Sequence, residues 1–112
     1  MSKKLKYDFE LVGDFPNKIL VAIHGWQGNR DSMKPLLRSL NINNMGWYFL
    51  EAPYPVFEKL DKFSWSYEIE KGVWEENEPR LLLTDFFDFL FNDHASTDIF
   101  VMGFSQGGLI CL

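Results

Sequence analysis

The sequence predicts an α/β fold with a mainly parallel sheet and flanking helices. Apolar runs at Ile19–Ile23, Gly46–Leu50 and Ile99–Met102 have the composition of strands. Two segments with helical periodicity separate them, at about residues 32–40 and 78–91. Parallel strands need a crossover of a dozen or more residues, and both connections are long enough. The chain therefore contains two strand–helix–strand units that share their middle strand.

The first of these units follows a separate strand and a turn. Residues 5–12 alternate loosely between apolar and polar, which predicts a half-buried strand. Residues 13–17 have the composition of a turn. The run at residues 19–23 is continuously apolar and rich in β-branched residues, which is typical of a strand buried on both faces.

The helix expected over residues 32–40 carries start signals. Asp31 or Ser32 can cap it, and Pro35 falls in its first turn, where a missing N–H is tolerated. The spacing of its apolar residues predicts one buried stripe. That stripe is Leu36, Leu37 and Leu40.

The helix expected over residues 78–91 has Pro79 in its first turn and Asp85 and Asp88 facing outward. Its apolar residues form two rows, so we expect burial over more than one face. The rows are Leu82, Phe86 and Phe89, and Leu83, Phe87 and Leu90.

Composition restricts the class of protein. The 112 residues are 46% hydrophobic and 24% charged, which suits one soluble domain. A net charge of -5 disfavours nucleic acid as a partner, because phosphate binding needs concentrated positive charge. No window is apolar over the length of a membrane span. The single cysteine, Cys111, cannot form an internal disulfide, so we predict a cytoplasmic protein.

The most informative motif is the run Gly-Phe-Ser-Gln-Gly-Gly at residues 103–108, directly after the last strand. A small-x-Ser-x-small turn between a strand and a helix lifts the serine hydroxyl out of a sheet as a nucleophile. Gly103 and Gly107 flank Ser105, where Cβ atoms would collide, and Gly108 permits close packing of the new helix. The N–H of Gln106 lies at the helix N-terminus, which favours negative charge. The alternative is that Ser105 is only a small residue in a tight turn.

A second motif, His24-Gly25-Trp26-Gln27-Gly28-Asn29, follows the other strongly apolar strand. Both motifs stand at the carboxyl end of a strand, where open α/β sheets bind their ligands. In hydrolases with a nucleophile turn, such a loop supplies a second oxyanion donor. The two motifs together predict a serine hydrolase.

These residues resemble the N-terminal half of an α/β-hydrolase, most closely the phospholipase/carboxylesterase group that includes acyl-protein thioesterases. The resemblance implies that Ser105 is the nucleophile, that the N–H groups of Trp26 and Gln106 form the oxyanion hole, and that His24 and Gly25 support its loop. It also implies hydrolysis of carboxylic esters or thioesters through an acyl-enzyme, without a metal or cofactor. The matching residues are His24-Gly25-Trp26, Ala52-Pro53-Tyr54-Pro55, Trp65 or Trp74, and Gly103 to Gly108.

The chain departs from this family after the nucleophile. Members of the family are longer, and their triad aspartate and histidine follow the serine. Only seven residues follow Ser105, and none can act as a base. We therefore expect residues 1–112 to be the N-terminal part of a single α/β-hydrolase domain, cut just after the nucleophile turn.

Other residues have two interpretations each. His24 could be the base, but we expect its ring to order the oxyanion loop. We expect His94 to be a solvated loop residue at the far end of the sheet and Cys111 to pack in the interior. The aromatic segment 54–77 either lines an apolar pocket or covers the sheet. Asp85, Asp88, Asp93 and Asp98 read as solvated charges, and no residue set has metal-ligand spacing.

Two alternatives to an active hydrolase remain. The chain could be a catalytically inactive truncated product or interaction module, in which residues 99–102 form an exposed apolar edge that causes self-association. A separate polypeptide could also supply the missing strands and triad residues. Under the hydrolase interpretation, the partner is a small-molecule ester or thioester.

Overall fold

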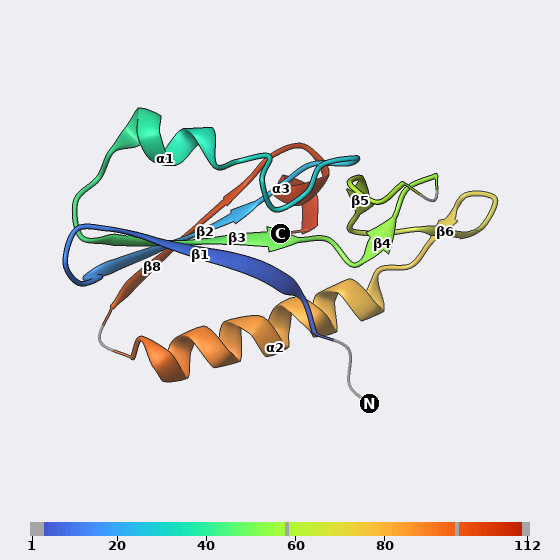
Figure 1. Cartoon of the computed structure of the whole chain (residues 1–112). Helices are drawn as coiled ribbons and strands as arrows, with labels where there is room; N and C mark the ends of the chain where they lie inside the picture. Colours follow the sequence, from blue (N-terminus) through green and yellow to red (C-terminus); the bar gives the residue numbers. More distant parts are fainter. Residues whose placement is uncertain (1–3, 58, 96, 111–112) are drawn as a thin grey trace.

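A computed structural model describes residues 4–57, 59–95 and 97–110 of the chain. A four-stranded sheet, in the order β1–β3–β2–β8, lies between helix α1 on one face and helix α2 on the other (Figure 1). Two small hairpins, β4–β5 and β6–β7, extend beyond one end of the sheet. The main elements are β1 (Lys6–Val12), β2 (Lys18–Ile23), α1 (Pro35–Leu40), β3 (Met45–Glu51), α2 (Asn77–Asp93), β8 (Asp98–Gly103) and α3 (Gln106–Ile110). The hairpin strands are β4 (Tyr54–Pro55), β5 (Phe63–Ser64), β6 (Glu68–Glu70) and β7 (Val73–Trp74).

The sheet is mixed, and this corrects the prediction of a mainly parallel sheet. Strand β2 pairs in parallel with both β3 and β8, as the two crossover units require. Strand β1 instead pairs antiparallel with β3, from Lys6 opposite Glu51 to Val12 opposite Met45. The reason is the connection at residues 13–17, which is too short for a parallel crossover and reverses the chain. Asn17 fixes this reversal by donating its N–H to the Asn44 carbonyl at 2.9 Å.

The core lies on both faces of β2 and β3, as predicted for β2. Every residue of β3 is buried, as are residues 19–23 of β2. Side chains alternate between the faces along a strand, so the sheet has two separate clusters. Towards α2 lie Ile19, Val21, Ile23, Tyr48 and Leu50, packed on Leu82, Leu83, Phe86 and Leu90. Towards α1 lie Leu20, Ala22, Met45, Trp47 and Phe49.

Helix α1 is shorter than predicted and differs at its start. It begins at Pro35, and its N-cap residue, Lys34, makes no capping hydrogen bond through its side chain. Asp31 and Ser32 are occupied elsewhere, because Asp31 forms an ion pair with Lys34 and Ser32 accepts the Asn29 N–H. The predicted stripe is only partly buried. Leu36 and Leu37 pack against the sheet, whereas Leu40 is 44% exposed.

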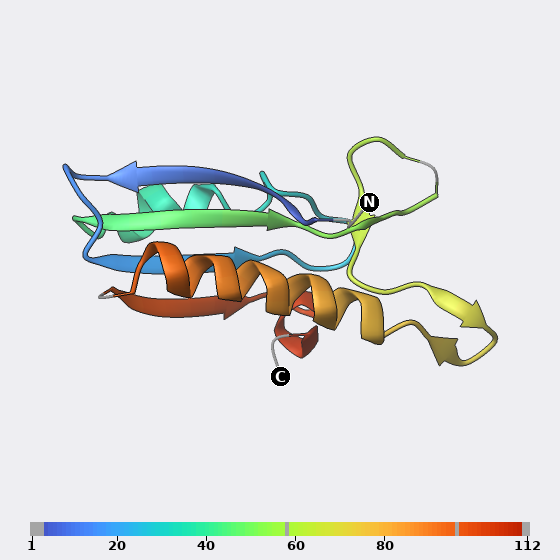
Figure 2. The same cartoon turned by 90° about the horizontal axis from the view of Figure 1, so that it is seen from below.

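Helix α2 runs beneath the sheet (Figure 2) and is longer than predicted at both ends. Asp85 and Asp88 face solvent, as expected. Burial over more than one face was the wrong expectation, because only one sheet face is available to pack on. Phe89 is accordingly 37% exposed and Phe91 57% exposed.

The last strand and helix match their predicted positions closely. Strand β8 covers residues 98–103, and α3 begins at Gln106, directly after the serine turn. Cys111, expected to pack in the interior, lies outside the described residues. No helix in the described part of the chain is both long and apolar enough to cross a membrane.

Three strands end on the same side of the molecule, and this positions the site. The carboxyl ends of β2, β3 and β8 point towards the hairpins (Figure 1). The loop after β2, the segment after β3 and the turn after β8 therefore meet at one edge of the sheet.

We predict that the isolated 112-residue chain self-associates through β8. Strand β8 pairs with β2 on one side, and no other strand of the described residues pairs with it. Phe100 is 51% exposed and Val101 is 47% exposed. An open apolar edge is a template for pairing with another chain. Light scattering over a concentration series should show growth in mean mass, and Val101→Lys should reduce that growth. A wild-type chain that stays monomeric at high concentration would contradict the prediction.

Candidate active site

Ser105 lies in a sharp turn between β8 and α3 and is exposed to solvent. Its φ is +54°, in the left-handed region that residues other than glycine rarely adopt. Two backbone hydrogen bonds brace the turn. Phe104 donates its N–H to the Ile23 carbonyl at 3.1 Å, and Gly107 donates its N–H to the Phe104 carbonyl at 2.9 Å. The turn therefore presents the serine hydroxyl at the carboxyl edge of the sheet, on a strained backbone.

Two of the three glycines around Ser105 occupy positions with no room for a side chain. A Cβ on Gly107 would lie 2.4 Å from the carbonyl oxygens of both Ile23 and His24. A Cβ on Gly103 would lie 2.6 Å from the Cα of Gly108. The Gly108 backbone thus lies close to Gly103, but a Cβ on Gly108 itself would come no nearer than 3.4 Å to another atom. The α3 backbone thus rests directly on the end of β2, mainly through Gly107.

The loop after β2 is in contact with the serine turn. A Cβ on Gly25 would lie 3.1 Å from the Phe104 carbonyl oxygen and 3.3 Å from the Cβ of Ser105. Trp26 follows, with a side chain that is 53% exposed. Within the described residues, the backbone N–H of Trp26 has no hydrogen-bond acceptor. Gln106 is the first residue of α3, so its N–H has no acceptor within the helix. One predicted oxyanion donor therefore lies in the loop that contacts Ser105, and the other lies at the start of α3, directly after Ser105.

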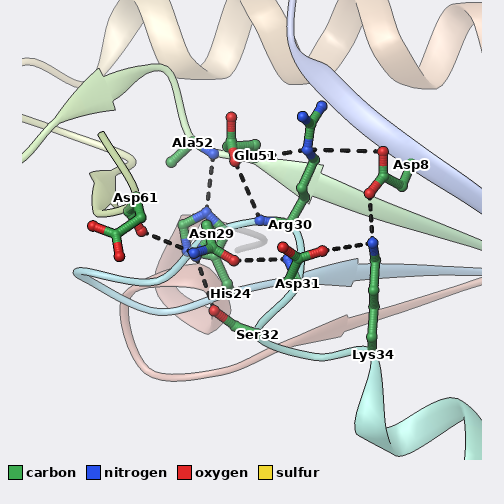
Figure 3. Close-up of polar contacts among 10 residues, drawn as sticks. All are labelled: Asp8, His24, Asn29, Arg30, Asp31, Ser32, Lys34, Glu51, Ala52 and Asp61. Atoms are coloured by element: carbon green, nitrogen blue, oxygen red, sulfur yellow. Dashed lines mark hydrogen bonds and ion pairs between the residues drawn. The ribbon is translucent and has the colours of Figure 1, made fainter. Parts of the chain in front are cut away.

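His24 is only 1% exposed, and both of its ring nitrogens have partners. The Ala52 N–H donates to Nε2 at 3.0 Å (Figure 3), and Nδ1 lies 2.6 Å from the Gly25 carbonyl oxygen. Because Nε2 is the acceptor, Nδ1 carries the proton and donates to Gly25. Burial lowers the pKa of His24, although the hydrogen bond to Gly25 and the charge of Glu51 oppose this shift. The neutral ring thus orders the loop and has no free lone pair for a role as the base.

Charged residues anchor the rest of this loop to the sheet (Figure 3). Lys34 contacts Asp8 on β1 at 2.5 Å and Asp31 at 2.6 Å. These hydrogen bonds, first to Asp31 and then to Asp8, raise the pKa of Lys34. Arg30 lies 3.7 Å from Asp8 and 4.0 Å from Glu51 at the end of β3. The sequence motifs do not indicate the contacts with Asp8 and Glu51, because these partners are far from Arg30 and Lys34 in the chain.

The aromatic segment 54–77 divides into a covering part and an exposed part. Trp65 is fully buried, donates its indole N–H to the His24 carbonyl at 2.9 Å and lies with its ring 5.5 Å from that of His24. Tyr67 and Trp74, on the β6–β7 hairpin, are 46% and 50% exposed. Of the two tryptophans named in the resemblance, Trp65 is therefore buried against His24, and Trp74 is exposed.

An apolar pocket of about 450 Å³ adjoins the loop after β2. Segment 54–77 contributes no residue to the walls of this pocket. The walls come from the loop, the start of α1 and the serine turn instead. They are Gly25, Trp26, Gln27, Gly28, Ser32, Met33, Pro35, Leu36 and Phe104.

His94 lies at the opposite end of the sheet, as expected, but it is not simply solvated. Its Nε2 is 3.0 Å from the hydroxyl of Tyr48 on β3. It follows α2 and precedes β8, whereas Ser105 follows β8. The length of that strand, roughly 17 Å at 3.3 Å per residue, separates the two ends. In the described part of the chain, no three His, Cys, Asp or Glu residues lie close enough to hold a metal ion.

We predict opposite outcomes for alanine at two adjacent glycines. Gly107→Ala forces a methyl group against two carbonyl oxygens 2.4 Å away and should cost about 1–3 kcal/mol of stability. Gly108→Ala meets nothing closer than 3.4 Å and should be neutral or slightly stabilising, because alanine favours helix. Urea unfolding of both variants checks this. Equal destabilisation would contradict the close approach at Gly107.

We predict that burial of His24 makes stability depend on pH. The folded-state pKa lies below the unfolded value of about 6.5, so the unfolded chain binds more protons between the two pKa values. Stability therefore falls as pH drops below about 6.5 and stops falling, for this group, below the folded-state pKa. Unfolding measured at a series of pH values should show this decline, and His24→Gln should lack that component. An identical pH profile for both proteins would refute it.

Comparisons with known proteins agree with this geometry at the level of fold. No protein-family model matches the sequence, and no match was found among curated proteins. Among solved structures, esterase PE8 is 16% identical, with a TM-score of 0.76, over 97% of this chain and 56% of its own. A Bacillus cereus carboxylesterase is 20% identical, with a TM-score of 0.69, over 96% and 51%. A Mesorhizobium loti carboxylesterase is 17% identical, with a TM-score of 0.67, over 85% and 46%.

The chain thus spans about half the length of these structures. At this level of identity the likeness concerns the backbone arrangement alone. It extends over nearly the whole chain. The described residues have the partial α/β-hydrolase fold that the matched half of these structures forms.

Proposed function

We propose that the protein is a serine hydrolase of the carboxylesterase kind, acting on carboxylic esters or thioesters through an acyl-enzyme. Ser105 is the nucleophile, and the N–H groups of Trp26 and Gln106 hold the oxyanion. The left-handed conformation of Ser105, with the Gly25 backbone packed against it, carries this proposal. The solved structures with the same fold, titled as esterases or carboxylesterases, support it.

The chemistry follows from the position of the hydroxyl. The Ser105 Oγ attacks the substrate carbonyl carbon and gives its proton to a base, and the carbonyl oxygen becomes an oxyanion held by the two N–H groups. Collapse of this intermediate expels the alcohol or thiol, which takes the proton from the base and leaves an acyl-serine. Water then attacks the acyl-serine by the same route, releases the acid and restores the hydroxyl.

The base in this proposal is a histidine outside these 112 residues. The chain has two histidines. Both ring nitrogens of His24 are engaged by backbone groups, and His94 lies at the far end of β8. A triad histidine and its aspartate must therefore reach Ser105 from elsewhere in the protein or from another polypeptide.

The apolar pocket beside the loop after β2 suits the acyl part of the substrate. Gly25 and Phe104 form part of its wall and also contact or adjoin Ser105. An acyl chain placed there would bring its carbonyl carbon to the hydroxyl. No ionisable side chain lines the pocket, so an uncharged group is the better fit. Ester and thioester substrates both remain within the proposal.

A non-catalytic interaction module is the less suitable alternative. It gives no reason for a serine in the left-handed region, where glycine or asparagine would be less strained. The exposed β8 edge is compatible with either function. A cytoplasmic location is also a proposal, and it rests on the single cysteine.

We predict that Ser105 alone among the serines reacts with a fluorophosphonate. The full-length gene product should become labelled, and mass spectrometry should locate the label on the peptide that contains Ser105. Ser105→Ala should abolish labelling and ester hydrolysis. Ser39→Ala, at an exposed serine on α1, is the matched control and should retain both. Labelling that persists in Ser105→Ala, or a wild-type protein that neither reacts nor hydrolyses esters, would contradict the proposal.

A further inference from the structure

We propose that the Gln106 side chain is a positioning residue that fixes the nucleophile turn relative to the oxyanion loop, by gripping residues 63–65. This inference rests on the proposed function, which assigns the backbone N–H of Gln106 to the oxyanion hole. It adds a second role for the same residue, through the amide at the end of its side chain. We call residues 63–65 the bridging segment.

One end of the bridging segment is held by the Gln106 amide. Its Oε1 accepts the backbone N–H of Trp65 at 3.0 Å, and its Nε2 donates to the Ser64 hydroxyl at 3.1 Å. The Ser64 hydroxyl donates to the Ser66 carbonyl at 2.5 Å, so its oxygen is available as an acceptor. The orientation of the amide is therefore determined by its partners. Ser64 is 4% exposed and Trp65 is fully buried, so water does not readily replace these bonds.

The other side of the bridging segment is bonded to the oxyanion loop. Gln27 donates its N–H to the Phe63 carbonyl, and Phe63 donates its N–H to the Gly28 carbonyl, both at 2.9 Å. The Trp65 indole N–H donates to the His24 carbonyl at 2.9 Å. The segment thus contacts the loop both before and after Trp26.

The two proposed oxyanion donors are consequently tied to one short segment. Trp26 stands between Gly25, whose carbonyl accepts from the His24 ring, and Gln27, whose N–H is held by Phe63. The other donor belongs to Gln106, whose side chain grips the segment directly. Loss of the amide would remove this connection through the bridging segment without removing either donor, and would leave only the direct contacts of the turn with Ile23, His24 and Gly25. Such a change should affect the transition state more than substrate binding.

Two substitutions with side chains of similar length distinguish the hydrogen bonds of the Gln106 amide from the space that the side chain fills. Gln106→Met fills the same space but cannot accept the Trp65 N–H, whereas Gln106→Glu keeps an acceptor oxygen. We expect amide hydrogen exchange at Trp65 to become about tenfold faster or more in Gln106→Met and to stay slow in Gln106→Glu. Unchanged exchange at Trp65 in Gln106→Met would contradict the proposed hydrogen bonding of Gln106 to the bridging segment. This measurement needs no activity, so its outcome is independent of the proposed function.

Kinetics of the full-length gene product decide whether the grip positions the catalytic groups. We expect Gln106→Met to lower kcat by about 10- to 100-fold while KM changes little, since a misplacement of about 1 Å has effects of that size. Ser64→Ala, which leaves the Trp65 bond in place, should give a smaller loss and serves as a second, milder variant. Faster exchange with an unchanged kcat would reduce Gln106 to a structural role and overturn the proposal. A wild-type protein without esterase activity would instead count against the proposed function.

Discussion

The hydrogen bond from the Ala52 N–H to the buried His24 ring is the contact on which the carboxyl edge of the sheet depends. It joins the residue that follows β2 to the residue that follows β3. The Nδ1–H of the same histidine donates to the Gly25 carbonyl, and the backbone carbonyl of His24 accepts the indole N–H of Trp65. Its carbonyl oxygen also forms part of the surface on which Gly107 rests. The buried, neutral ring of His24 and its peptide group thus connect β2, β3, the loop after β2 and helix α3.

The contacts around His24 explain how the chain holds the strained backbone at Ser105. The serine turn has few contacts of its own, since Ser105 and Phe104 are exposed. Its geometry comes from the carboxyl end of β2, where the Ile23 carbonyl accepts the Phe104 N–H and the carbonyl oxygens of Ile23 and His24 lie against Gly107 of α3. The ion pairs of Arg30 and Lys34 with Asp8 likewise hold the other end of the loop against β1. Order at this edge is therefore imposed by the neighbouring strands and not by the loops themselves.

Sequence reasoning succeeded where a short stretch of chain contains its own signal. The buried strand at residues 19–23, the long helix and the serine turn all follow from local apolar pattern and glycine spacing. It failed where a residue has competing partners or where its partner is distant. Asp31 and Ser32 have capping chemistry, but they bond to Lys34 and Asn29, three positions away, instead. The bond between Gln106 and Trp65 joins residues 41 positions apart, and no local pattern signals it.

The left-handed backbone at Ser105 has a consequence for how this chain would change under mutation. A residue with a Cβ in that region is roughly 1–2 kcal/mol less favourable than in the right-handed region, and glycine does not bear this cost. Selection for stability alone would therefore act to replace the serine. Under the proposed function, the hydroxyl persists only while its chemistry is useful, so the identity of residue 105 in any descendant of this sequence would report whether that use has continued.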